Sequence, residues 1–451
     1  MTDLNQTDGG PLAAIHPRVH ELVQRGIEGL KSGIYPGKVF NDPEVYDVER
    51  KRIFGKAWIY LGHVTEIPNN GDYVLRNIAE DALVLVRGSD GIIRGFLNAC
   101  THRGAQLCRA EKGNSKTFRC PYHGWTFANT GKLMGIPCEK EAYGDAVDKT
   151  KWGMLEIPKL DIFQGLIFGS LDPNAMSLDD FLGNMKWYLE IMTNRTAGGL
   201  EVVGPPQRWI VEGDWKQPAD NFIGDSYHTQ TAHQSIVEIG LLPPDPLFAM
   251  YGELIEMGNG HGAGMTGAPP GIELPPFFGL PNEIVEQAKT RLTAAQMTVA
   301  MKTNFFHATV FPNFSFLNIM PAKDDVSRPV SMISFRLWQP AGYGKIEIWS
   351  WHLREKDLPE AYKEESHKAY LRTFGISGTF EQDDAEIWQS VHHSMKGQLA
   401  EKLNFNFQMG HTTLEPLKDW PGPGRAYASG YNEYPQRGWH SRWLQYMNGT
   451  I

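Results

Sequence analysis

The sequence predicts a protein of the α+β class, in which a β-rich segment separates two stretches that contain helices. Residues 1–56 carry apolar side chains at helical spacing, residues 57–175 alternate short strand-like runs with turns, and residues 176–451 mix both patterns. The chain also contains 47 glycines and 29 prolines, a high proportion that argues against a helical bundle. We therefore expect three consecutive segments with these boundaries.

The first segment predicts two helices. Apolar residues between positions 20 and 31 recur at the spacing that places them on one helix face. A second helix is predicted to begin at Asp42, whose side chain can accept hydrogen bonds from the first turn, with Pro43 at the first helical position. We therefore expect residues 1–56 to form a short N-terminal helical segment.

The second segment, residues 57–175, predicts a small antiparallel β domain. Its apolar runs are strand-sized and are separated by turn residues such as Asn69-Asn-Gly71 and Ser89-Asp-Gly91. The clearest predicted strands are residues 57–61, 72–76, 82–86 and 92–97.

The third segment, residues 176–451, mixes helices and strands. Residues 241–285 are so rich in proline and glycine that we expect them to form an irregular lid over a site. The predicted strands are residues 330–338 and 345–351, and the predicted helices are residues 178–192, 215–236, 360–372 and 383–396.

The composition excludes several classes of protein. The net charge of −9 does not favour binding to nucleic acid or to an anionic membrane. Four cysteines in 451 residues are too few for a disulfide scaffold and suit a reducing compartment. The N-terminus is polar, and no apolar run approaches the ~18 residues of a membrane helix. We therefore expect a soluble cytoplasmic protein.

Four residues of the β-rich segment form a metal-ligand pattern. Cys100 precedes His102 by two positions, and after 17 intervening residues Cys120 precedes His123 by three. Two thiolates and two imidazoles suit either tetrahedral zinc or an iron–sulfur cluster. Each arm holds one cysteine and one histidine, which favours a [2Fe–2S] cluster whose irons take two cysteines and two histidines, respectively. In this pattern, residues 57–175 resemble a Rieske domain.

A pair of histidines suggests a second metal site. His228 and His233 lie five positions apart, which is not a neighbour spacing on a regular helix. Non-heme Fe(II) in oxygenases is bound by two histidines and one carboxylate on one face, which leaves positions for O2 and substrate. Taken alone, the pair fits ordinary core or surface histidines better than a metal site.

The surrounding residues resemble the mononuclear-iron motif of the Rieske aromatic-ring-hydroxylating oxygenases. The matching positions are Asn221, Asp225, His228 and His233. The third ligand of that family ends a Gly-x-Phe/Trp-Glu-x-Asp-Asp run, which residues 378–384 match. The resemblance therefore implies Asp384 as the third ligand. Its neighbour Asp383 is expected to face solvent or to cap a helix, although the sequence alone does not exclude it as the ligand.

Over nearly its full length, the chain resembles the large (α) subunits of naphthalene- and biphenyl-type Rieske non-heme iron dioxygenases. The resemblance implies an antiparallel β-sandwich Rieske domain, residues 57–175, inserted in a catalytic domain. That domain would comprise residues 1–56 and 176–451, with a curved antiparallel sheet covered by helices in a helix-grip arrangement. Each subunit would hold one [2Fe–2S] cluster and one mononuclear Fe(II). A small β subunit would complete an α3β3 heterohexamer, with electrons from NAD(P)H through a reductase and a ferredoxin.

The resemblance also implies roles for two residues beside the iron ligands. In the family, the residue matching Asp225 bridges an iron-bound histidine, here His228, and a Rieske histidine of the neighbouring α subunit, at the position of His123. A carboxylate that accepts from two ligand N–H groups fixes both rings and couples the metal centres. Asp225 and Asn221 are therefore the expected catalytic residues.

The substrate is expected to be neutral and aromatic. Judged by position relative to the motifs, the expected pocket residues are Phe222, Ser226, Thr229, Leu317, Phe374 and Phe380. This set is largely apolar and lacks lysine and arginine, so an anionic substrate would be buried without a partner. We expect a bicyclic or polycyclic hydrocarbon that receives both atoms of O2 to give a cis-dihydrodiol, with angular attack also open.

Two alternatives remain at this point. The same two metal centres could insert one oxygen atom, as in an aromatic monooxygenase or a salicylate- or phthalate-type hydroxylase. A pure electron-transfer Rieske protein would need no functional iron outside the cluster. The sequence does not identify the aromatic substrate, the ring positions attacked or the redox partners.

Overall fold

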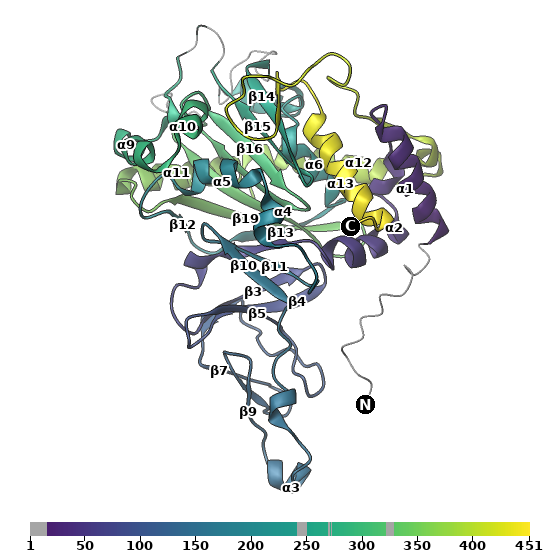
Figure 1. Cartoon of the computed structure of the whole chain (residues 1–451), viewed down its shortest axis with the longest axis vertical. Coiled ribbons are helices and arrows are strands. Elements are labelled where there is room, and N and C mark those ends of the chain that lie inside the picture. The colour runs from purple at the N-terminus through teal and green to yellow at the C-terminus, as the bar shows by residue number, and fades with distance from the viewer. Residues whose placement is uncertain (1–15, 241–249, 269–270, 272, 322–328) are drawn as a thin grey trace.

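The computed structural model describes residues 16–240, 250–268, 271, 273–321 and 329–451. A broad body of helices and sheet narrows at one end into a β-rich extension that is tipped by the short helix α3 (Glu139–Tyr143) (Figure 1). Within these residues, no helix is both long and apolar enough to cross a membrane.

The N-terminal segment packs against the C-terminal part of the chain. Helix α1 (Pro17–Leu30) contacts α13 (Tyr434–Asn448), and strand β1 (Ile34–Pro36) pairs antiparallel with β20 (Asn404–Asn406). The predicted cap is confirmed, because the Asp42 carboxylate accepts hydrogen bonds from the first turn of α2 (Pro43–Glu49). The 3-10 helix η1 (Gly37–Phe40) precedes α2, and the π-helix η2 (Arg50–Phe54) follows it directly.

The β-rich extension contains three small antiparallel sheets. The predicted strands are present there, with ends shifted by one or two residues. One sheet has the order β10 (Lys159–Phe163), β11 (Leu166–Ser170), β2 (Ile59–His63). The second has the order β5 (Ile93–Leu97), β4 (Asp81–Arg87), β3 (Asp72–Ile78), β6 (Lys112–Asn114). The third has the order β7 (Thr117–Arg119), β8 (Thr126–Ala128), β9 (Leu133–Gly135). Two 3-10 helices, η3 (Val64–Glu66) and η4 (Lys149–Lys151), also belong to this part.

The body is built on a nine-stranded antiparallel sheet. Its order is β12 (Leu200–Val202), β19 (Lys345–Glu355), β18 (Met332–Pro340), β17 (Phe314–Ile319), β16 (Phe305–Val310), β15 (His261–Thr266), β14 (Gly252–Gly258), β21 (Arg425–Ala428). The ninth strand, β13 (Gln207–Glu212), also pairs with β19. Every residue of β17 and β18 is buried, so the centre of this sheet forms the core of the body.

Helices cover the sheet, and α6 (Lys216–Gly224) contacts β15, β16 and β17. Two predicted helices are interrupted: residues 178–192 form α4 and α5, and residues 215–236 form α6, α7 and α8. The remaining helical elements are α4 (Leu178–Leu182), α5 (Met185–Thr193), α7 (Thr229–Ala232), α8 (Gln234–Glu238), η6 (Phe277–Gly279), α9 (Asn282–Arg291), α10 (Ala294–Ala300), α11 (Glu360–Thr373), α12 (Thr379–Ser394) and η7 (Gln398–Lys402).

The expected lid over residues 241–285 is wrong for a large part of that segment. Strands β14 and β15 lie inside it and are inner strands of the nine-stranded sheet. The glycines of β15 allow close packing: a Cβ at Gly264 would come within 2.2 Å of His307 Nε2 on the next strand. Residues 241–249, 269–270 and 272 lie outside the described residues, so the lid expectation is not tested there.

A buried ion pair connects the N-terminal segment to the body. Lys216 and Glu49 are both fully buried, and Lys216 Nζ lies 2.7 Å from Glu49 Oε1. The indole N–H groups of Trp215 and Trp443 also donate to the Glu49 carboxylate, at 2.9 and 2.7 Å. Elements α2, α6 and α13 therefore meet at one carboxylate.

The buried environment of His261 leads us to expect a loss of stability in acid. Its Nε2–H donates to the Phe181 carbonyl at 2.7 Å, and its Nδ1 accepts from the Phe311 N–H at 2.9 Å. Burial lowers the pKa of His261 to about 4. The unfolded chain therefore binds more protons between pH 4 and about 6.5, so the free energy of unfolding falls as the pH falls through this window.

We expect His261 to account for about 1 kcal/mol of the stability lost between pH 7 and pH 5.5. Denaturant unfolding of the wild type and of His261→Gln at both pH values measures this difference, because the variant lacks the titrating group. His20→Gln, at an exposed histidine, is the control and should keep the wild-type pH dependence. Equal pH dependence in His261→Gln and the wild type would contradict the prediction.

Candidate metal centres

Two loops of matching geometry bring together the four residues of the first ligand pattern. The Cys100 carbonyl accepts from the Gly104 N–H at 2.7 Å, and the Cys120 carbonyl accepts from the Gly124 N–H at 3.1 Å. Both glycines have positive φ, +71° and +74°, which a residue with a Cβ rarely adopts. Each loop therefore turns tightly after its cysteine and presents the following histidine beside it.

The side chains of this quartet fit a mixed-ligand cluster. Cys100 and Cys120 are buried, and burial together with the nearby Cys120 thiol raises the pKa of Cys100. The rings of His102 and His123 lie 4.7 Å apart. Their Nδ1 atoms are buried, and neither has a hydrogen-bond partner within the described part of the chain. Buried ring nitrogens are normally satisfied, so these two fit metal ligands.

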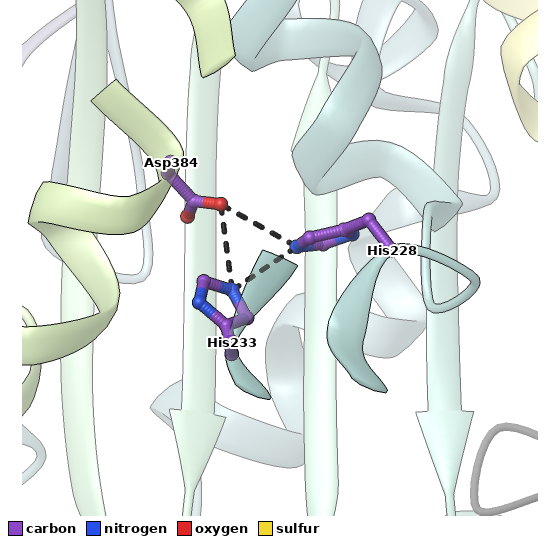
Figure 2. A group of neighbouring side chains, drawn as sticks. All are labelled: His228, His233 and Asp384. Carbon is purple, nitrogen blue, oxygen red and sulfur yellow. Dashed lines mark hydrogen bonds and ion pairs between the residues drawn. The ribbon is translucent and has the colours of Figure 1, made fainter. Parts of the chain in front are cut away.

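The second pattern converges from two parts of the body, the residues that flank α7 and helix α12. Figure 2 shows His228, His233 and Asp384 pointing toward one another, with His228 Nε2 and His233 Nε2 3.2 Å apart. Each of these nitrogens lies 3.4 Å from Asp384 Oδ1. Two imidazoles and one carboxylate that face one point suit a divalent cation such as Fe(II).

The break after α6 explains the spacing of five residues. Helix α6 ends at Gly224, and the single turn of α7 begins at Thr229, directly after His228. His233 follows α7 with φ −100° and ψ 33°, so the chain leaves the helix there. An uninterrupted helix would direct the two rings apart, whereas this kinked stretch directs both toward Asp384 on α12.

Asn221 and Asp225 hold the His228 ring from its other side. His228 Nδ1 contacts the Asp225 carbonyl and lies 3.2 Å from Asn221 Nδ2, and the Asn221 amide donates to Asp225 Oδ2 at 3.3 Å. Burial opposes the charge on Asp225, but His228 and these hydrogen bonds outweigh it and hold the pKa of Asp225 below its usual value. The Asp225 carboxylate therefore stays ionised beside the site.

The contacts of Asp383 differ from those expected from the sequence. It lies inside α12 and does not cap a helix, and its carboxylate contacts both His233 and Ser235. Its side chain is 27% exposed, whereas that of Asp384 is 5% exposed. Which of the two consecutive aspartates meets both imidazoles depends on the rotation of α12, and the structure places Asp384 there.

A buried arginine holds the start of α12 against the sheet. Arg336 on β18 lies 2.9 Å from Glu381 as an ion pair, and both side chains are almost fully buried. Arg336 also donates to the Phe374 carbonyl at 2.5 Å. Burial raises the pKa of Glu381 to about 7, although the Arg336 guanidinium opposes this shift. Glu381 precedes Asp384 by one helical turn, so this pair fixes the face that α12 presents.

The six expected pocket residues are all buried, but their contacts differ. Phe380 stacks on Phe374 with ring centroids 5.0 Å apart, and its ring lies 4.9 Å from that of His233. Phe222 meets Phe374 edge to face at 6.4 Å. These three rings form an aromatic shell beside the histidines. The other three residues, Ser226, Thr229 and Leu317, are also buried.

His307 is a further residue of this region that the sequence did not single out. Its Nδ1–H donates to the Phe222 carbonyl at 2.9 Å, which leaves Nε2 to accept from the Ser226 hydroxyl at 3.2 Å. Burial lowers the pKa of His307 to about 4, so the ring is neutral at pH 7. Leu317 pairs with His307 across β16 and β17. No local motif marks His307, because only the strand pairing brings it beside α6.

Loss of the Glu381 carboxylate should destabilise the chain strongly. At pH 8, where the wild-type Glu381 is mostly ionised, Glu381→Ala leaves the buried guanidinium of Arg336 without its partner, which costs roughly 3–5 kcal/mol. Glu381→Gln should cost less, because its amide oxygen keeps a partial negative charge beside the Arg336 guanidinium. Denaturant unfolding measures both, with the exposed Glu386→Gln on the same helix as the control. A loss below 1 kcal/mol in Glu381→Ala would contradict this account.

Comparison with known proteins agrees with both centres. The sequence pattern of the Rieske [2Fe-2S] domain matches residues 57–158, and that of the ring-hydroxylating alpha subunit catalytic domain matches residues 179–449. A solved structure of naphthalene 1,2-dioxygenase from Rhodococcus sp. bound to indole is 52% identical, with a TM-score of 0.94. The match covers 96% of this chain and 99% of that one.

Two curated relatives span almost the whole chain. The α subunit of an N,N-dimethyl phenylurea N-demethylase from Sphingobium sp. is 34% identical over 96% of this chain and 95% of its own. The α subunit of biphenyl dioxygenase from Metapseudomonas furukawaii is 33% identical over 99% of this chain and 98% of its own. In this family the Rieske domain binds a [2Fe–2S] cluster, and the catalytic domain binds a mononuclear non-heme iron. The chain therefore belongs to the Rieske non-heme iron ring-hydroxylating oxygenases, as an α subunit of the naphthalene and biphenyl dioxygenase type.

Proposed function

We propose that the chain adds both atoms of O2 to a neutral aromatic hydrocarbon, giving a cis-dihydrodiol. The observation that carries this proposal is the aromatic shell of Phe222, Phe374 and Phe380 beside two histidines and a buried carboxylate. Such a surface favours an apolar ring over a charged one. The 52% identity to a naphthalene 1,2-dioxygenase bound to indole supports a substrate with two or more rings.

The metal-ligand assignment is part of this proposal. His228, His233 and Asp384 would hold the mononuclear iron, and the [2Fe–2S] cluster would take Cys100, His102, Cys120 and His123. When bound, the cluster supplies single electrons and the iron activates O2. The chain itself orients His228 through Asn221 and Asp225, while the buried aromatic rings exclude water from the substrate.

We propose that Asp225 connects the mononuclear site to the Rieske domain of a neighbouring α subunit. Its carboxylate already contacts His228, and one third of the side chain (34%) is exposed. An exposed edge leaves room for a second imidazole N–H, which would come from the neighbour's residue at the position of His123. One carboxylate would then orient a ligand of each metal centre.

The domain boundaries are proposed as residues 57–175 for the Rieske domain and residues 1–56 with 176–451 for the catalytic domain. The end of the Rieske domain at residue 175 is supported by β10 and β11, which follow residue 158 and complete a sheet with β2. The pairing of β1 with β20 and the contact of α1 with α13 support the assignment of the N-terminal segment.

The partners follow from the names of the relatives as α subunits. We propose a small β subunit in an α3β3 assembly, and a ferredoxin with an NAD(P)H-dependent reductase as electron donors. None of the four cysteines forms a disulfide, which suits the cytoplasm.

A second candidate function is monooxygenation, including removal of an N-methyl group. It is favoured by one specific observation: a relative that matches 96% of this chain is an N-demethylase α subunit. Demethylation begins with the insertion of one oxygen atom, so the number of atoms incorporated separates the two functions.

Loss of Asp384 should remove the mononuclear iron and spare the cluster. The enzyme should contain about three irons and two acid-labile sulfides per α chain. In Asp384→Ala we expect about two irons, an unchanged cluster absorption spectrum and no product, because a carboxylate ligand is missing. Metal analysis and visible spectroscopy check this, with Glu386→Gln as the control. Full iron content and turnover in Asp384→Ala would contradict the ligand assignment.

Isotopic labelling should show two incorporated oxygen atoms. With purified enzyme, a ferredoxin, a reductase and NADH, we expect ¹⁸O2 to add two labelled atoms to naphthalene or biphenyl as a cis-dihydrodiol. The substrate panel also includes phenanthrene, dibenzofuran, salicylate, phthalate and an N,N-dimethyl phenylurea. Mass spectrometry reads the number of labelled atoms in each product. Turnover of the phenylurea or of an acid alone, with one labelled atom, would favour monooxygenation.

A further inference from the structure

The two imidazoles of the mononuclear site each contact an aspartate on the side remote from Asp384. For His228 this is Asp225, part of the family motif. For His233 it is Asp383, whose Oδ2 lies 3.3 Å from His233 Nδ1. The two consecutive aspartates of α12 thus approach one ring from opposite nitrogens, since Asp384 Oδ1 lies 3.4 Å from His233 Nε2.

We propose that Asp383 is a positioning residue for His233, and this rests on the proposed role of His233 as an iron ligand. The Asp383 carboxylate accepts the proton on Nδ1, so the lone pair of Nε2 points toward Asp384. An imidazole that binds a metal through one nitrogen commonly donates its other N–H to a carboxylate, which fixes the tautomer and the ring orientation.

Other contacts of α12 and α8 support this role. Phe380, from the preceding turn of α12, packs its ring 4.9 Å from the His233 ring. Ser235 donates its hydroxyl to Asp383 Oδ2 at 3.3 Å, which holds the carboxylate from the chain that follows His233. The His233 ring is therefore held by a tilted contact with the Phe380 ring and by the Asp383 carboxylate at Nδ1, and both come from the helix that carries Asp384.

The exposure of Asp383 makes the inference testable without loss of the fold. Its side chain is 27% exposed, so a smaller residue there opens no internal cavity. Removal of such an outer carboxylate typically weakens metal binding by about 10- to 100-fold. A residue with a purely structural role would instead change the stability of the iron-free chain.

The test measures Fe(II) affinity in enzyme whose cluster is intact and whose mononuclear site has been depleted. We expect Asp383→Ala to raise the Kd for Fe(II) by about 10- to 100-fold. Asp383→Asn should recover most of the affinity, because its amide oxygen can accept the same proton. Ser235→Ala should show a smaller loss, and Glu386→Gln on the exposed side of α12 should bind like the wild type. The spectrum of the ferrous nitrosyl adduct should change in Asp383→Ala and return in Asp383→Asn.

Several results would overturn the inference. The first is Fe(II) binding by Asp383→Ala as tight as that by Glu386→Gln. The second is Fe(II) binding by Asp383→Asn as weak as that by Asp383→Ala. A lower Tm of the iron-depleted Asp383→Ala protein, equal to that of Glu381→Ala, would show a general structural role instead. Asp384→Ala separates this inference from the ligand assignment. If Asp384→Ala binds Fe(II) normally, the assignment itself fails; if it loses Fe(II) while Asp383→Ala does not, only the role of Asp383 fails.

Discussion

The body of this protein is organised around a small buried space that requires a positive charge. His228 Nε2 and His233 Nε2 face each other at 3.2 Å, and Asp384 Oδ1 lies 3.4 Å from each. The lone pairs of the two nitrogens and the carboxylate oxygen repel one another at these distances. A shared proton relieves this repulsion, and a cation that all three groups bind relieves it more fully. The local backbone follows this requirement, because α6 ends early and α7 is a single turn, which together direct both rings inward.

The rest of the body makes this arrangement rigid. The nine-stranded sheet supports α6 directly, and the buried Arg336–Glu381 pair holds the first turns of α12. Glu49 connects α2, α6 and α13 through Lys216 and two indoles, so the beginning and the end of the chain both brace the helix that precedes the histidines. Precise placement of a metal site depends on such support from regular elements.

The sequence could predict features whose signal is local. Helical periodicity found α1, α11 and α12, the Asp42 cap followed from residue type, and the paired Cys-His arms showed the cluster domain. It missed β14 and β15, because their glycines pack against neighbouring strands and give no apolar alternation. Pairing with β16 and β21, distant in the sequence, makes them strands. The contacts of Asp383 and His307 were likewise unpredictable, since they depend on helix rotation and on strand register.

The close approach of Gly264 to His307 has a consequence for the size of the ring that the proposed site accepts. The imidazole of His307 occupies the room that the missing side chain leaves, and it is anchored there by the Phe222 carbonyl and Ser226. Even one methyl group at position 264 would collide with that imidazole and would disturb its hydrogen bonds to Phe222 and Ser226. If His307 borders the proposed substrate site, a substitution at Gly264 would change the shape of that site through His307, from a strand position behind it.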